Sequence, residues 1–483
     1  MSEKKTGRNP KFIEAALILV AIIVILLYCV IFRSTGAQIP LVLCVFVVGL
    51  FAAYLGYGLD EIMEMAYSGM RQGEMALLFN CMIGFIVASW TAAGIMPYII
   101  YLGLGWISPA MLATIACVVC AIMSTLIGSS WTTAGTVGLA FVGIGIGMGM
   151  PAPLIAGAVI SGSTFGDKLS PLSETTVVAA AAAKTPLMQH VHAMLYTSVP
   201  ALVIGCIMYS VIGARYGSSA VDASQINEIR SVLATTFNFN PLLFLVPVVL
   251  VVMIIKKVDS LFCLCVAAIL GTLIAVFYQG YNLSETASFL MNGLGESVTE
   301  NAMVNSMLKK GGLNAMWFTI SLIITAFPLA GLLQQNNILK TVVGKSSLIL
   351  KSPTAAITAS LVTPAVLCII TGASYVPAVL TAATYGDVYD DLELDRKVLS
   401  RSGEDTGTLF SPFVPWHGSG VYFSSTLGVP TLEYAPYYFL GWLDPLVALF
   451  CAFTGWGVFY TEGRRGWGKK NRYVKKDKQV SAN

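Results

Sequence analysis

The chain has 483 residues, of which 56% are hydrophobic and only 11% are charged, with a formal net charge of +3. Soluble domains carry roughly 25% charged residues, so this composition excludes an ordinary soluble enzyme. The basic residues gather at the two ends of the chain, as expected beside a membrane. We therefore expect a lipid bilayer as partner and no nucleic acid.

Continuous apolar stretches recur from the first residues to the last, and each is near the roughly 20 residues that a helix needs to cross a bilayer. Because they do not alternate with polar residues, they predict helices rather than a barrel. The first stretch exceeds the roughly 7 to 15 residues of a signal peptide, so we expect it to remain as an anchor. The predicted spans are 12–32, 38–57, 75–103, 109–127, 133–149, 190–213, 239–255, 260–279, 313–334, 353–371, 376–386, 407–428 and 433–460.

The fold class predicted from these spans is an all-α polytopic membrane protein. Its basic carboxyl-terminal tail favours a cytoplasmic location for both termini, in the inner (cytoplasmic) cell membrane. The predicted divisions are an amino-terminal cytoplasmic segment with the first membrane helix (1–37), membrane repeat 1 (38–215), an extracytoplasmic linker (216–238), membrane repeat 2 (239–460) and the tail (461–483).

Three short motifs occur twice in the same order, as in transporters built from two related halves. Lysine-rich loops after 255 and after 334 place the equivalent spans 75–103 and 313–334 in opposite directions. Two inverted repeats are therefore predicted. The paired motifs are Tyr57 to Glu61 with Tyr281 to Glu285, Gly128 to Trp131 with Gly372 to Tyr375, and Gly166 to Pro171 with Gly407 to Pro412.

The segment 161–176 is the most polar stretch at membrane depth. Gly166 and Pro171 predict a helix break there, and broken helices in transporters bind ions with the freed backbone groups. Asp167 and Glu174 are costly carboxylates at this depth, hence functional candidates. Either acid could hold a proton or a cation by turns, which is sufficient for antiport. The structural alternative is that Asp167 pairs with Lys168 at a helix end and Glu174 caps the next helix.

Residues 128–136 form a second candidate site, because glycines and hydroxyl side chains separate two apolar arms. This pattern predicts a re-entrant hairpin tip, with hydroxyl oxygens for a cation or donors for an anionic substrate. Close helix packing is the alternative.

The partner break in the second half offers Asp405 and His417 as titrating groups. Nearby, Asp387, Asp390, Asp391, Glu393 and Asp395 predict a solvated loop. His190 and His192 lack a third ligand, so we expect no metal site beyond sodium.

The motifs at 128–136 and 165–176, with 190–196 and 402–407, resemble the NhaC family of sodium/proton antiporters. The resemblance implies inverted repeats with two re-entrant hairpins, broken helices, a mobile transport domain and a dimer-forming scaffold. It also implies Na⁺ and H⁺ as transported ions, with no cofactor. The family includes malate/lactate exchangers, and Val177 stands where the family pattern has Asn.

From this combined evidence we predict an ion-coupled secondary antiporter rather than an enzyme, exchanging sodium for protons. Exchange of small organic carboxylates or amino acids is the alternative, and a channel is a further one. The predicted proton- or cation-binding residues are Asp167, Glu174 and Asp405. The predicted ion- or substrate-binding residues are Gly128, Ser129, Ser130, Trp131, Thr132, Ser170, Ser173, Thr175, Thr176, Gly372, Ser374, Tyr375, Thr406, Ser411, Trp416 and His417.

Overall fold

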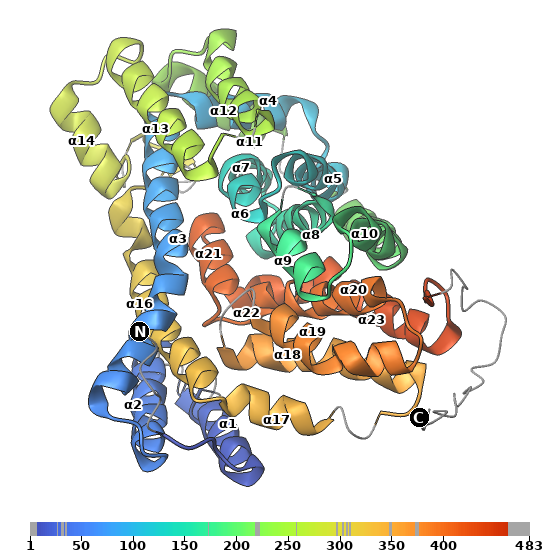
Figure 1. Cartoon of the computed structure of the whole chain (residues 1–483). Coiled ribbons are helices and arrows are strands. Elements are labelled where there is room, and N and C mark those ends of the chain that lie inside the picture. The colour runs from blue at the N-terminus through green and yellow to red at the C-terminus, as the bar shows by residue number, and fades with distance from the viewer. Residues whose placement is uncertain are drawn as a thin grey trace, which may run out of the picture.

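The computed structural model shows a helical protein in which segments from both halves of the chain pack side by side (Figure 1). It describes residues 7–26, 28–29, 33, 36–171, 173–217, 223–256, 258–295, 298–301, 304–305, 308, 311–346, 350–371 and 376–461. Among these residues the regular structure is helical, apart from one antiparallel bridge between Leu394 and Tyr460.

The helices of the first half cover most of the predicted spans. They are α1 (Phe12–Leu26), α2 (Gln38–Tyr54), α3 (Leu59–Ala92), α4 (Ile95–Trp106), α5 (Pro109–Ile127), α6 (Ser130–Thr133), the π-helical turn Ala134–Gly138, α7 (Leu139–Gly147), α8 (Ala152–Leu169), α9 (Glu174–Ala182), α10 (Leu187–Gly217) and α11 (Ala223–Thr236).

The second half begins with a 3₁₀ turn at Pro241–Phe244. It continues with α12 (Leu245–Ile255), α13 (Ser260–Phe277), α14 (Leu283–Asn292), α16 (Leu313–Gln335), α17 (Ile338–Ser346), α18 (Pro353–Thr371), α19 (Val376–Asp391), α20 (Arg396–Gly407), a 3₁₀ turn at Ser411–Phe413, α21 (Gly418–Leu427), α22 (Thr431–Tyr434), a 3₁₀ turn at Ala435–Tyr437 and α23 (Phe439–Thr454).

Several of these helices are long and apolar enough to cross a bilayer. Within the described residues there are five, or up to eight if each of three sharply bent helix pairs counts as one span. One bent pair corrects the predicted span 75–103, since α3 and α4 meet at an angle of 69°. Gly94, at φ 78°, lies in the left-handed region that ends helices and makes this turn.

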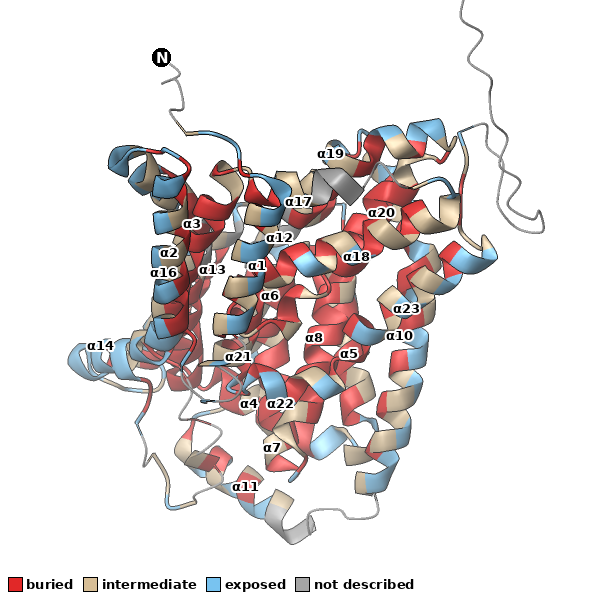
Figure 2. Cartoon of the chain, turned by 90° about the horizontal axis from the view of Figure 1, so that it is seen from below, coloured by how far each residue is buried: buried red, intermediate tan, exposed pale blue. Residues whose placement is uncertain are grey.

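Figure 2 shows exposed positions along the peripheral helices α2, α10 and α16, and many of these positions hold large apolar side chains. On α10, Val203, Ile207 and Val211 follow one another at helical spacing and are each more than half exposed. Water would disfavour such a continuous apolar stripe, whereas lipid tails cover it. The structure is therefore that of a multi-pass membrane protein.

Glycines allow the closest helix crossings. A Cβ on Gly69 of α3 would lie 2.0 Å from the carbonyl oxygen of Phe327 in α16, and one on Gly331 would lie 2.2 Å from that of Met65. Gly166 packs α8 against α5 in the same way, since its Cβ would meet the Ala121 carbonyl oxygen at 2.4 Å. The prediction that Gly166 breaks the helix is therefore wrong: it is a close-packing residue inside α8.

Three polar or mixed segments are helical where the sequence predicted otherwise. The stretch before Asp167 forms most of α8, and α11 lies in the predicted linker. The acidic run is only partly a loop, because α19 runs through Asp387 to Asp391, but Asp387, Asp390 and Asp391 are exposed as predicted, and Asp395 caps α20. Asp390 accepts hydrogen bonds from Arg396, which lowers the pKa of this carboxyl.

The first pair of repeated motifs begins a helix in each half. The Glu61 carboxylate accepts a hydrogen bond from the Gly58 amide at the start of α3, and the Glu285 carboxylate accepts one from the Asn282 amide at the start of α14. Only the second is a full capping box, because the Asn282 side chain also accepts a hydrogen bond from the Glu285 amide, whereas Gly58 has no side chain. The helices then differ, since α3 continues to Ala92 whereas α14 ends at Asn292.

Candidate functional site

Asp167 lies in the last turn of α8, at the helix break that the sequence predicted. The Ser130 hydroxyl, at the start of α6, donates to its carboxylate at 2.6 Å. Ser129 positions α6 by accepting a hydrogen bond from the Thr132 amide at 3.2 Å. The two polar segments singled out in the first half therefore meet at one carboxylate.

The break itself spans Ser170 to Ser173, between α8 and α9. Pro171 lies within it and lacks a backbone donor. From the first helical turn of α9, the Thr176 hydroxyl donates to the carbonyl oxygens of Lys168, at 3.0 Å, and Asp167, at 3.3 Å. The carbonyl end of α8 is thus partly satisfied by a side chain, and it remains next to the Asp167 carboxylate.

Lys168 points away from Asp167 into a buried ion-pair network. Its Nζ lies 2.6 Å from Asp405 Oδ1 and 2.6 Å from Asp444 Oδ2, and all three side chains are fully buried. The Thr197 hydroxyl of α10 donates to Asp405 Oδ1 at 3.0 Å. The structural alternative of an Asp167–Lys168 pair is therefore wrong, because Lys168 joins α8 to α20 and α23 instead.

Arg401 and Glu404 extend this network along α20. The Arg401 Nε lies 3.6 Å from Asp405 Oδ2, and its Nη1 donates to the Gly457 carbonyl oxygen at 2.7 Å. Glu404 is fully buried, and among the described residues neither carboxyl oxygen has a hydrogen-bond donor. Charged and polar side chains thus fill the centre of a helix whose residues from Val398 to Gly407 are all buried.

Trp131 connects the Ser130 turn to the second half. Its indole stacks on the Tyr422 ring of α21, with 4.4 Å between ring centroids and 7° between planes. The Tyr422 hydroxyl donates to the Trp131 carbonyl oxygen at 2.6 Å. The backbone that presents Ser130 to Asp167 is therefore held from both halves of the chain.

The other predicted residues lie at varied distances from Asp167 in the fold. Glu174 is exposed in the first turn of α9, whereas Asp405 is buried beside Lys168. Ser173 and Thr175 form a hydroxyl pair at 3.0 Å in the break. Gly128 ends α5 in the left-handed region, at φ 76°. Gly372, Ser374 and Tyr375 lie outside the described residues.

In the second half, four predicted residues make structural hydrogen bonds. Thr406 donates to the Leu361 carbonyl oxygen, and Ser411 to that of Thr408, each at 2.6 Å. The Trp416 indole donates to Ile369, and the His417 ring accepts from the Ser419 amide, which caps α21. His190 is also buried, and its Nδ1 lies 2.6 Å from the Ser400 hydroxyl.

Sequence reasoning missed the ion-pair role of Lys168 and did not select Arg401, Glu404 or Asp444. Asp444 carried a usable signal, because it is a carboxylate within the apolar stretch 433–460. Lys168 carried another, since a cation at membrane depth needs an anionic partner. Their mutual contact was not visible, because it joins three helices from distant parts of the chain.

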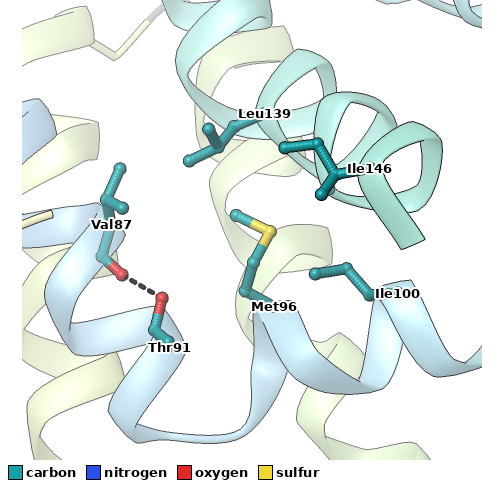
Figure 3. Close-up of a pocket in the computed structure, with 7 residues that line it drawn as sticks. Val87, Thr91, Met96, Ile100, Leu139 and Ile146 are labelled. Atoms are coloured by element: carbon teal, nitrogen blue, oxygen red, sulfur yellow. Dashed lines mark hydrogen bonds between the residues drawn. The ribbon is translucent and has the colours of Figure 1, made fainter. Parts of the chain in front are cut away.

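A small cavity between α3, α4 and α7 is not part of this site. Val87, Met96, Ile100, Leu139 and Ile146 line it, and the Thr91 hydroxyl is bonded to the Val87 carbonyl oxygen at 2.6 Å (Figure 3). All its lining residues are uncharged. The Asp167 region, in contrast, combines a carboxylate, hydroxyls and a helix end.

The fold and the site are those of a membrane transporter, because a broken helix among membrane-spanning helices places a carboxylate beside hydroxyl groups. The Na⁺/H⁺ antiporter family model matches residues 162–456, and the chain belongs to this family. That range contains both the α8–α9 break and the whole Lys168 network.

Curated relatives align over most of the chain. A malate-2H⁺/Na⁺-lactate antiporter of Bacillus subtilis is 34% identical, over 98% of this chain and 99% of that protein. The arginine/ornithine antiporter ArcD of Halobacterium salinarum is 33% identical, over 94% of each chain. The Na⁺/H⁺ antiporter NhaC of Alkalihalophilus pseudofirmus is 32% identical, over 87% of this chain and 91% of that protein.

Proposed function

We propose that this protein is a secondary antiporter, not an enzyme, and that it exchanges sodium for protons at Asp167. The observation that carries the proposal is the 2.6 Å contact between Ser130 and Asp167 at the end of a broken helix. A desolvated carboxylate favours a proton, whereas sodium favours an ionised carboxylate with hydroxyl and carbonyl oxygens around it. One group would then hold either ion, but not both.

The surrounding polar groups support this choice of residue. Ser129 and Thr132 place hydroxyls at the start of α6, and Thr176 places one beside the carbonyl oxygens at the end of α8. Asp405 already has Lys168 and Thr197 as partners. We therefore assign Asp405 to the ion-pair network and Asp167 to ion exchange.

The same proposal includes the finer architecture. Two inverted repeats would place the α8–α9 break opposite the 3₁₀ turn at Ser411–Phe413, with α5 and α6 as one re-entrant hairpin. The helices around Asp167 and Lys168 would form a mobile transport domain, and α1, α2, α3 and α16 a scaffold that dimerises in the cytoplasmic membrane. Figure 1 supports the grouping, because α2, α3 and α16 lie together on one side of the molecule.

A second candidate is exchange of small organic acids or amino acids. The names of two relatives, a malate/lactate antiporter and an arginine/ornithine antiporter, favour it. Val177, which replaces the Asn of the family pattern, is also consistent with a different cargo. In this case the Ser130 and Ser129 hydroxyls would bind a substrate carboxylate.

Proteoliposomes containing the full chain distinguish the two candidates. We expect a sodium gradient, without any organic solute, to drive proton movement that a trapped pH-sensitive dye reports. Flux that requires malate, lactate, arginine or ornithine would instead support the second candidate and contradict the first.

Asp167→Asn tests the assigned residue in the same vesicles. Since the amide neither binds a proton nor carries charge, we expect sodium-driven proton flux to fall at least about 100-fold, a loss within the range attributed to removing a proton-transfer group. Asp391→Asn is the matched control, because Asp391 is exposed at the end of α19. Wild-type flux in Asp167→Asn would remove Asp167 from the ion-binding role.

A further inference from the structure

Glu404 stands out among the buried acids because it forms no ion pair within 4 Å in the part of the chain that the structure describes. Asp405 and Asp444 each contact Lys168 at 2.6 Å. Glu404 is equally buried, yet among the described residues neither of its oxygens accepts a hydrogen bond, and the Thr175 hydroxyl lies near it but outside bonding geometry.

The charged and titratable groups around Glu404 come from several elements. Asp167 and Lys168 lie on α8 within electrostatic range, and Asp405 follows Glu404 directly on α20. Arg401 lies on the same helix, less than one turn earlier, and Asp444 belongs to α23. His190 of α10, close to Lys168 and Arg401, is neutral when its Nδ1 accepts a hydrogen bond from the Ser400 hydroxyl.

The charges of this network do not balance when every acid is ionised. Lys168 and Arg401 supply two positive charges, whereas Asp405, Asp444 and Glu404 supply three negative charges, all on fully buried or nearly fully buried side chains. An unpaired buried charge costs several kcal/mol, by order of magnitude. One bound proton makes the network neutral, and among the described residues Glu404 is the acid of the three that no cation contacts directly.

We propose that Glu404 binds a second exchanged proton, separate from the one at Asp167. This inference rests on the proposed sodium/proton exchange. In each cycle one proton would leave Asp167 as sodium binds, and the other would leave Glu404 when the contact between α8, α9 and α20 opens to water. Hydration then stabilises the ionised carboxylate. Two protons would be exchanged for one sodium ion, so that each cycle moves net charge.

The test is a measurement of stoichiometry with Glu404→Gln in proteoliposomes. With the membrane potential held at zero by potassium and valinomycin, a fixed sodium gradient is opposed by graded pH gradients until no net proton flux occurs. Loss of one of two protons doubles the pH gradient that balances the sodium gradient. It also makes exchange insensitive to an imposed potential. Glu433→Gln, at an exposed position in α22, is the matched control and keeps the wild-type balance point.

Each outcome decides the inference. A balance point in Glu404→Gln equal to that of the wild type contradicts it. If Glu404→Gln does not fold, Glu404→Asp is the variant to test. The proposal requires that Glu404→Asp keep the wild-type balance point and shift the pH dependence of the exchange rate. An unchanged pH dependence would overturn it. If the wild type itself shows no sodium-driven proton flux, the proposed function fails instead, which separates the two results.

Discussion

Lys168 is the residue on which two halves of the chain converge. Its single ammonium group contacts carboxylates from α20 and α23 with no exposure to solvent. Breaking a buried ion pair by removing one partner leaves a charge without compensation, which costs more than the pair contributes.

Lys168→Met is therefore predicted to destabilise the protein by about 3 to 5 kcal/mol, the range for such removals. The measurement is the unfolding midpoint of the detergent-purified protein, followed by scanning fluorimetry. Lys351→Met provides the control, since Lys351 is exposed before α18. Recovery of part of the lost stability by Lys168→Met with Asp444→Leu would support the pair as the cause, and equal midpoints for Lys168→Met and the wild type would contradict it.

At the scale of single residues, the sequence indicated which groups are costly at membrane depth but not which groups meet. Asp167 was identifiable because a carboxylate beside a helix break has few structural roles. The contact of Ser130 with Asp167 and that of Lys168 with Asp405 could not be predicted. Asp167 and Lys168 are neighbours in the chain, but their side chains point to different helices. That divergence depends on the direction of the last turn of α8.

Helix contacts in this protein depend on residues without side chains. α5 and α8 approach so closely that a Cβ on Gly162 would lie 2.0 Å from the Cys117 carbonyl oxygen. No rotamer change relieves a contact between a Cβ and a backbone atom, so the helices themselves must move apart. The same contact positions Asp167, one and a half turns further along α8.

Gly162→Ala is accordingly predicted to lower the free energy of unfolding by about 1 to 3 kcal/mol, as overpacking does, and to reduce transport through displacement of Asp167. Gly205→Ala serves as the control. Its Cβ would meet Phe439 at an ordinary 3.6 Å, and alanine favours a helix by up to about 1 kcal/mol over glycine. Equal unfolding midpoints for the two variants would show that the α5–α8 contact is not tight in the membrane.

Apolar elements were largely predictable from the sequence, whereas polar buried ones were not. α5, α16 and α18 begin and end within a few residues of the predicted spans. α20 was missed as a span because the charged residues Arg401, Glu404 and Asp405 interrupt the apolar pattern, although each is buried by neighbouring helices. Hydropathy records the cost of such a helix in lipid, but not the partners that offset it.

At the scale of the whole molecule, the charge distribution predicts an orientation in the membrane. The segment 461–483 contains eight Lys and Arg residues clustered after α23, at 464, 465, 469, 470, 472, 475, 476 and 478. Basic segments next to membrane helices are retained on the cytoplasmic side.

Reporter fusions test this orientation. A fluorescent protein attached after residue 483 is predicted to fluoresce, and alkaline phosphatase attached there to be inactive, because the phosphatase folds only outside the cytoplasm. The same pair placed in the segment 218–222, between α10 and α11, is predicted to give the reverse pattern and acts as the internal control. An active phosphatase at the carboxyl terminus would overturn the predicted topology.

Asp167 and Lys168, which are neighbours at the end of α8, make contacts of two different kinds. This difference bears on how the family diversifies. Asp167 faces Ser130, while Lys168 is committed to acids on other helices. With Asp167 in the role that we propose for it, we expect mutations around Ser130 to change what is carried without disturbing the ion pairs that join the helices. Three relatives that are about one-third identical have names that specify different cargoes, namely lactate, ornithine and sodium. A separation of this kind would permit that diversity. The proposal thus implies that selection on cargo and selection on folding act on adjacent codons, those of Asp167 and Lys168.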